Sequence, residues 1–246
     1  MDIKVFKSLL EESKKIVGFT GSGISTESGI PDYRSQGGTW KKYQPVYYDE
    51  FLNDDDKRLL YWRRKQEQWD SICSSEPNNG HKFFKDLFDR KKLLGLITQN
   101  IDGLHERSGI PTGMIVNLHG NTLETGCLDC GNIIPSTDIF SVLDLSKGAP
   151  RCGLCNGLLK PNTISFGQQL DPYSIEKAKK FSIECDLMLI MGSTLIVNPA
   201  VSFPLIAKQC GAKMVIINLS ETPLDEKSDF VIHMKIGEFV EKLNSD

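Results

Sequence analysis

Residues 16–25 read IVGFTGSGIS, an apolar run that passes straight into two closely spaced glycines. The run Ile16–Thr20 is short and almost wholly apolar, which is typical of a strand buried on both faces of a sheet. In open α/β sheets a glycine-rich turn after such a strand is where a dinucleotide binds its phosphates, at the N-terminus of the next helix. A tight strand-to-helix turn that binds nothing is the alternative. Either reading predicts an α/β fold.

The same rhythm continues along the chain. Further buried strands are predicted at Leu93–Thr98, Leu187–Met191 and 214–218, and amphipathic helices at 80–92, 171–182 and 199–211. Continuous apolar strands separated by helices indicate a parallel sheet that is covered on both faces. The predicted fold class is therefore α/β, a doubly wound, Rossmann-like parallel sheet.

Two regions interrupt this rhythm. Residues 35–79 hold no clear buried strand but a charged helical stretch at 56–71, and the region from Cys127 to Cys155 is rich in turns. Both are interpreted as insertions that together form a smaller second domain. The predicted domains are therefore a large one from residues 1–34, 80–120 and 158–246, and a small one from the helical insertion 35–79 and the insertion 121–157.

Four cysteines form two close pairs in the second insertion. They are Cys127, Cys130, Cys152 and Cys155, so two Cys-x-x-Cys units stand 21 residues apart. This spacing is typical of tetrahedral zinc held by four thiolates, a closed and therefore structural site. A redox pair is the alternative, but it would use one unit and leave the other unexplained. Cys73, Cys185 and Cys210 are predicted to be ordinary, mostly buried thiols.

The composition excludes several classes of protein. The 246 residues carry a net charge of −3, so no strongly basic nucleic-acid surface is expected. No apolar run approaches the roughly 20 residues of a membrane span. Residues 1–15 place apolar side chains at helical spacing, which predicts an amphipathic helix and not a signal peptide. With an odd number of cysteines, seven, a secreted disulfide framework is not indicated, and a cytoplasmic protein is expected. No oligomeric state is predicted.

The glycine turn continues into Gly29-Ile30-Pro31-Asp32-Tyr33-Arg34, and this run resembles the motif of the sirtuin (silent information regulator) family. The resemblance implies an NAD site in which Tyr33 covers the nicotinamide ribose and Arg34 helps to hold the cofactor loop. It also implies cofactor contacts from Gly21, Ser22, Gly23, Ile24 and Thr26. The family usually has alanine where this chain has Ser22, and phenylalanine where it has Tyr33.

Polar residues follow the predicted strand Leu93–Thr98. Gln99, Asn100, Ile101 and Asp102 stand where ligands bind in open α/β sheets, although one Asn or Asp there would serve equally as a helix cap. The segment resembles the sirtuin motif that lines the nicotinamide pocket, which implies catalytic roles for Asn100 and Asp102. Gln99, Asn100, Ile101 and Asp102 are all implied as cofactor contacts.

His119 follows a further strand end and precedes the first cysteine pair, as the catalytic histidine of sirtuins does. Its ordinary pKa of about 6.5 suits a general base at neutral pH. The other histidines, His81, His105 and His233, are predicted to be surface or core residues without a catalytic role.

The C-terminal half adds three more stretches with the same resemblance. The segment from Lys160 to Gly167 is similar to the sirtuin strand that receives the substrate peptide, with Ile164, Phe166 and Gly167 as implied contacts. The family commonly has glutamate where this chain has Gln168. Contacts with the adenosine half of NAD are implied for Gly192, Ser193, Thr194, Asn218 and Ile236. For Ser193 and Thr194, helix capping is the alternative.

Taken together, the resemblance implies an NAD-dependent protein-lysine deacylase that releases nicotinamide and O-acyl-ADP-ribose and binds acylated lysine peptides. Mono-ADP-ribosyl transfer by the same family is the alternative reaction. A sensor of NAD or ADP-ribose without turnover is a second alternative, which would predict loss of His119 or Asn100. A zinc-knuckle nucleic-acid binder agrees less well with the net charge.

One short motif bears on the acyl group. Tyr61 and Arg64 stand three apart in the helical insertion, and the pair resembles the Tyr-x-x-Arg of sirtuins that prefer succinyl, malonyl or glutaryl lysine. On a helix both would share one face, where they could converge on a carboxylate. The alternative is a solvated basic face formed by Arg63, Arg64 and Lys65, with plain deacetylation as the reaction.

Overall fold

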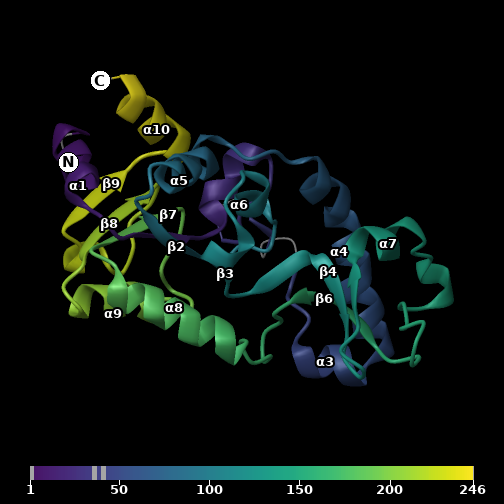
Figure 1. The fold of residues 1–246 in the computed structure, drawn as a ribbon. Coiled ribbons are helices and arrows are strands. Elements are labelled where there is room, and N and C mark those ends of the chain that lie inside the picture. The colour runs from purple at the N-terminus through teal and green to yellow at the C-terminus, as the bar shows by residue number, and fades with distance from the viewer. Residues whose placement is uncertain (1–2, 35–37, 40–42, 246) are drawn as a thin grey trace.

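The computed structural model describes residues 3–34, 38–39 and 43–245, and it places two sheets side by side in one molecule (Figure 1). Residues 1–2 of the predicted N-terminal helix, and residues 35–37 and 40–42 of the helical insertion, lie outside the described residues. In the described part of the chain, no helix has the length and apolar character needed to cross a membrane.

The larger sheet has six parallel strands in the order β3-β2-β1-β7-β8-β9. They are β1 (Ile16–Thr20), β2 (Leu93–Thr98), β3 (Ile115–Asn117), β7 (Leu187–Met191), β8 (Lys213–Asn218) and β9 (Phe230–His233). The prediction of a doubly wound parallel sheet is confirmed. Because the order reverses between β1 and β7, the crevice where such folds bind ligands lies beyond the carboxyl ends of these two strands.

Helices cover both faces of this sheet. One face carries α1 (Ile3–Glu12), α5 (Asn79–Asp89) and α10 (Ile236–Ser245), and the other carries α8 (Pro172–Glu184) and α9 (Ser202–Gln209) (Figure 1). The central strands supply side chains to both cores in alternation: Leu189 packs into the first, and its neighbours Met188 and Ile190 into the second. This double burial explains why the strands are continuously apolar.

The starts of two helices are set by local sequence. Asn78 caps α5 by accepting hydrogen bonds from the amides of Gly80 and His81, and Asp171 does the same for α8, where Pro172 occupies the first turn. Such caps satisfy amides that have no partner within the helix, and proline at this position removes one of them. The predicted helices therefore begin within a few residues of their expected positions.

The smaller sheet is antiparallel, in the order β5-β4-β6. Its strands are β4 (Gly120–Cys127), β5 (Ile133–Pro135) and β6 (Leu159–Thr163), and it packs with α3 (Tyr48–Asn53), α4 (Asp55–Ser74) and α7 (Ser136–Ser141). The sequence predicted α4 but not this sheet. Strand β6 pairs with β4 although residues from 158 onward were assigned to the large domain. The domain boundaries themselves remain a prediction.

Short elements complete the described chain: α6 (Leu104–Arg107), η1 (Ser22–Ser28), η2 (Thr112–Met114), η3 (Leu145–Lys147) and η4 (Asp225–Lys227). The helix after the glycine turn, η1, is a 3₁₀-helix. One prediction about the isolated cysteines was wrong in part, because Cys73 and Cys210 are exposed whereas Cys185 is buried. Both exposed thiols lie close to helix ends, Cys73 in the last turn of α4 and Cys210 just after α9, where the chain leaves its packed face.

Candidate active site

A cavity of about 860 Å³ lies at the carboxyl ends of the parallel strands and extends to the small domain. All predicted cofactor and substrate residues line it, with two exceptions, Ile24 and Asp102. The cavity therefore brings together residues from Gly21 to Ile236 that the sequence had assigned to separate motifs. Both exceptions are buried directly behind its wall.

The two glycine loops pack against each other at the strand switch point. The amide of Gly21 donates to the carbonyl of Met191, and that of Gly23 donates to the carbonyl of Gly192 over 2.9 Å. A Cβ on Gly23 would lie 2.8 Å from the Cα of Gly192, and one on Gly192 would lie 2.3 Å from the amide of Ile24. Glycine is thus required here for close contact between two backbones. These two amides are already bonded within the protein, so the expected phosphate contact would fall to other groups of the loop.

Ser25 joins the two residues that the sequence placed in catalysis. Its Oγ donates to Oδ2 of Asp102 over 2.7 Å and accepts from Nδ2 of Asn100 over 3.1 Å. The second oxygen of Asp102 accepts from the amide of Leu104, so this carboxyl also begins α6. Burial raises the pKa of Asp102 above its ordinary value. The sequence analysis did not select Ser25, although it ends the quoted glycine stretch.

Two buried histidines lie behind this network. The rings of His81 and His105 stand 4.8 Å apart, and Nε2 of His105 is 2.9 Å from the hydroxyl of Thr20. Burial lowers the pKa of His81 to about 4 and that of His105 well below its ordinary value, so both are neutral near pH 7. As predicted, His81 and His105 are core residues, and His233 lies nearer the surface, close to Asp225.

His119 stands between the two sheets, just after β3 and just before β4. Its Nδ1 lies 3.0 Å from the carbonyl oxygen of Gln99. A carbonyl can only accept, so Nδ1 carries the proton and Nε2 is left with its lone pair. Burial lowers the pKa of His119, and the charge of Arg34 lowers it further. The imidazole is therefore neutral and basic at physiological pH.

Tyr33 and Arg34 also line the cavity. Burial raises the pKa of Tyr33 to about 12, with a further contribution from the charge of Asp102, so its phenol remains protonated. Asp32 forms the turn that places both residues by accepting a hydrogen bond from the amide of Arg34 over 3.0 Å.

The far end of the cavity is formed by the strand ends of the larger sheet. Nε2 of Gln99 donates to the hydroxyl of Ser193 over 2.9 Å, and the same hydroxyl accepts from the amide of Leu195. Asn218 closes β8 and donates to the carbonyl of Ser220. Ser193 thus forms a local turn and part of the cavity wall, and it caps no helix, because the next helix, α9, begins at Ser202.

The predicted substrate segment, Lys160–Gly167, begins within β6, which is an edge strand of the small sheet, and continues beyond it. The amide of Ile164 donates to the carbonyl of His119 over 2.8 Å, which fixes the segment beside the histidine. The ring of Phe166, largely exposed, lies 5.9 Å from that of Tyr47. Gln168, where the resemblance led us to expect glutamate, accepts from the amide of Ser165 and closes the segment into a turn.

Tyr61 and Arg64 both line the small-domain end of the cavity, and both have partners within the protein. The hydroxyl of Tyr61 is 2.9 Å from that of Thr163. The guanidinium of Arg64 donates to the carbonyl of Gln44 and lies over the ring of Tyr43. Its Nε is buried and has no hydrogen-bond partner among the described residues. The Nε donor of Arg64 is therefore available to a ligand.

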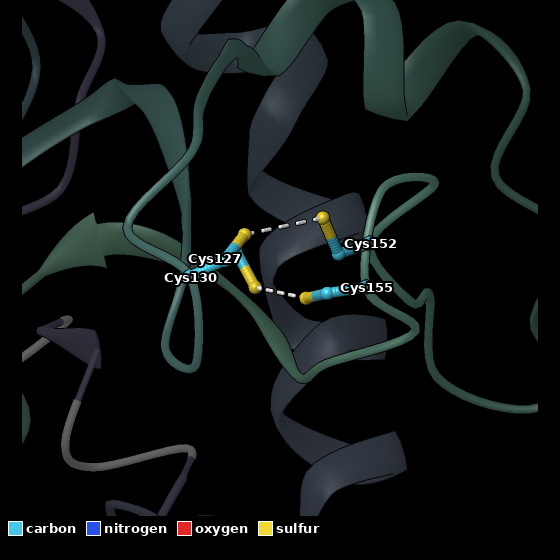
Figure 2. Close-up of side chains that lie close together, drawn as sticks. All are labelled: Cys127, Cys130, Cys152 and Cys155. Atoms are coloured by element: carbon cyan, nitrogen blue, oxygen red, sulfur yellow. Dashed lines mark hydrogen bonds between the residues drawn. The ribbon is translucent and has the colours of Figure 1, made fainter.

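The four paired cysteines converge on one point, as Figure 2 shows. Their Sγ atoms all lie within 4.8 Å of one another, with 3.5 Å between Cys127 and Cys155 and 3.8 Å between Cys130 and Cys152. Zinc bound to four thiolates at 2.3 Å would separate them by about 3.8 Å, so the cluster fits tetrahedral zinc. It lies outside the cavity lining and offers four ligands, which makes it a structural site.

Comparisons with known proteins agree with this arrangement. The Sir2 family model matches residues 21–199. An NAD-dependent protein deacetylase of Rhodopseudomonas palustris is 41% identical over 230 residues, which cover 94% of this chain and 91% of that protein. The chain belongs to the Sir2 family.

Solved structures show the same fold in full. A Sir2 with a deacetylated p53 peptide and 3'-O-acetyl ADP ribose superimposes with a TM-score of 0.90 at 34% identity, over 100% of this chain and 98% of that one. A Sir2 with a p53 peptide and NAD⁺ gives a TM-score of 0.87 at the same identity and coverage.

Proposed function

We propose that the cavity is the active site of this chain, which by its family and relatives is an NAD-dependent protein deacylase. The observation that carries the proposal is the position of His119 in the cavity, with Nδ1–H bonded to the carbonyl of Gln99 and Nε2 left as a base. When bound, NAD would supply the ribose carbon that exchanges nicotinamide for the acyl oxygen of lysine, and with one water consumed the products would be nicotinamide, free lysine and O-acyl-ADP-ribose.

We propose that the strand ends of the larger sheet hold NAD. The adenosine half would lie against Gly192, Ser193, Thr194, Asn218 and Ile236, and the phosphates near Gly21, Ser22, Gly23 and Thr26. The nicotinamide end would lie against Gln99, Asn100, Ile101, Tyr33 and Arg34. Asp102 and Ile24 support these contacts from behind the wall, since Asp102 orients Asn100 through Ser25.

We propose that His119 is the general base of the reaction. Its Nε2 would accept a proton from a ribose hydroxyl, while the carbonyl of Gln99 keeps the ring oriented and stabilises the positive charge that the proton brings. The lowered pKa keeps the lone pair available before this step.

The substrate is proposed to be an acylated lysine in an extended peptide. β6 is an edge strand, so the segment with Ile164, Phe166 and Gly167 can pair with an added strand through main-chain hydrogen bonds. The acyl-lysine would then reach past Phe166 to His119, and Tyr61 and Arg64 would border its acyl end. Because the hydroxyl of Tyr61 and part of Arg64 are already bonded, this arrangement favours a short neutral acyl group.

One incubation tests the proposal. When the pure protein is incubated with NAD and an acetyl-lysine peptide, nicotinamide should be released and the peptide should lose the mass of one acetyl group. The amount of nicotinamide released should equal the amount of peptide deacetylated. Nicotinamide release with ADP-ribose on a protein would instead establish the transferase alternative. NAD binding without nicotinamide release would establish the sensor.

We further propose a cytoplasmic location. It is supported by the cysteines, which are free thiols, four of them placed to hold a metal.

A further inference from the structure

Lys65 is a cation in an unusual position. It lies one residue beyond Arg64 on α4 and lines the same cavity, and its Nζ stands 5.6 Å from the centre of the Tyr61 ring. None of the ion pairs found among the described residues includes it. The side chain is only partly exposed, so its amine lies against the cavity wall with limited contact with solvent.

A second lysine lies close by. Lys160 on β6 is buried, and its Nζ is 5.4 Å from the centre of the same Tyr61 ring. It donates to the carbonyl of Thr163 and does not line the cavity. Burial lowers the pKa of Lys65 to about 8, and burial together with the charge of Lys65 lowers that of Lys160 to about 7. Two weakly basic amines thus flank one ring, and the cavity reaches one of them.

We propose that Lys65 is a site of covalent acylation, whose amine takes the acyl group of a reactive thioester. The lone pair of Nζ attacks the thioester carbonyl, the C–N bond forms and the C–S bond breaks. The sulfur leaves as a thiolate with the electron pair, and the amine proton passes to solvent. A cation of the cavity wall becomes a neutral amide. The proposal concerns Lys65 alone and does not require the deacylase reaction.

The expected rate follows from the free amine available. At pH 7.5 about a quarter of an amine with a pKa near 8 is unprotonated, against about 0.1% for an unperturbed lysine. Nucleophilicity falls with basicity, with a coefficient of about 0.4–0.5 in thiol chemistry, and a similar coefficient here leaves a net gain of about tenfold. Fast acylation requires both a lowered pKa and access for the thioester, and three lysines of this chain differ in these two properties. Lys65 has a lowered pKa and access, Lys160 has a lowered pKa without access, and Lys179 is exposed on α8.

The test treats the full chain with a small thioester, S-acetyl-N-acetylcysteamine, at pH 7.5. Peptide mapping by mass spectrometry then follows the acetylation of each lysine with time. Lys65 should react about tenfold faster than Lys179, and Lys160 more slowly than both. Mapping is needed because a terminal α-amine also reacts near neutral pH.

A variant guards against misassignment. In Lys65→Arg the fast internal site should disappear from the map, while the rate at Lys179 stays the same. The proposal is overturned if Lys65 reacts no faster than Lys179, or if an equally fast internal site remains in the variant.

Discussion

The two sheets of this molecule are stabilised by different means. Strands β1, β7 and β8 are almost completely buried between two layers of helices, and their apolar side chains supply both cores. The small sheet has one modest core, which includes the thiols Cys127 and Cys152, and its strand β5 is largely exposed. We therefore expect the large sheet to be stable through hydrophobic burial alone, and the small sheet to depend on a zinc ion held by its four cysteines.

This difference divides the active site. The proposed NAD contacts lie beyond the strand ends of the large sheet, whereas the proposed peptide and acyl contacts lie on α4 and on the segment after β6 of the small sheet, with His119 at the junction. Perturbing one region should therefore affect one substrate more than the other. The predictions below test this division, beginning with the largest effect.

Removing one zinc ligand should unfold the small domain. In Cys152→Ser we expect the loss of about one zinc per chain, because structural zinc contributes on the order of 10–16 kcal/mol in zinc-finger peptides. Hydrogen exchange should lose protection over 120–163 and keep it over 187–218. The control is Cys210→Ser, which removes an exposed thiol outside the cluster. Equal protection in both segments of Cys152→Ser would show that the small sheet does not need the metal.

Replacing the proposed base should abolish the reaction without unfolding either region. For His119→Ala we expect deacylation to fall on the order of 10²–10⁴-fold, the usual contribution of a general base. NAD binding, measured by calorimetry, and the thermal transition should change little. His233→Ala, outside the cavity lining, is the matched control. Deacylation by His119→Ala at the wild-type rate would eliminate this mechanism.

Most of the large sheet could be predicted from the sequence, whereas the small sheet could not. Three strands of the large sheet, Ile16–Thr20, Leu93–Thr98 and Leu187–Met191, have the predicted bounds, because continuous apolar runs are a local signal. The small sheet was not predicted, since β4 and β6 pair across more than thirty residues of chain and carry few apolar side chains. Periodicity gives no evidence of such long-range pairing.

Within the site, the motif residues were found but their connections were not. Ser25 joins Asn100 to Asp102 across distant segments, and no local pattern shows that contact. Likewise, the glycines of the first loop looked like a phosphate cradle, but Gly23 serves a backbone contact with Gly192. Lys65, read as part of a solvated basic face, lines the cavity.

A change at the acyl end should alter the choice of acyl group. Arg64 retains an unpaired Nε, so any acidic acyl group that the enzyme accepts would contact this side chain. If succinyl-lysine is turned over, Arg64→Met should lower that rate by roughly 10- to 100-fold, the contribution of a charged hydrogen bond. Acetyl-lysine turnover should change much less. Arg63→Met, its exposed neighbour, is the control. An unchanged ratio of succinyl to acetyl turnover would remove Arg64 from acyl recognition.

The pH dependence of deacylation should reflect the lowered pKa of His119, which lies at the junction of the two regions. The pKa of His119 is lowered below 6.5, chiefly by burial, and the base must be unprotonated to act. Activity is therefore present above the lowered pKa and is lost as the pH falls through it. In kcat/KM for the peptide, the acidic limb should lie below pH 6.5, so the value at pH 6.5 exceeds half of the plateau. A limb centred above pH 6.5 would contradict this assignment.

The smallest effect is expected within the large region alone, at the contact between Glu27 and α10. A carboxylate oxygen of Glu27 accepts from the amide of Gly237 over 2.7 Å, at the N-terminus of this ten-residue helix. A negative charge there is favourable by about 0.3–1 kcal/mol. The contact holds Ile236, the adjacent residue, in the cavity wall where the adenine is proposed to bind.

Glu27→Gln keeps an acceptor but removes the charge, so the KM for NAD should rise about two- to fivefold, which is the factor that this energy represents. The kcat and the KM for peptide should not change, because neither the junction nor the small domain is touched. Glu238→Gln removes a charge from the same helix turn, where the carboxylate pairs with Lys242 and lies outside the cavity lining, and it should leave every constant unchanged. A rise in the peptide KM of Glu27→Gln would mean that the two regions are coupled, and the division of the site proposed here would then be wrong.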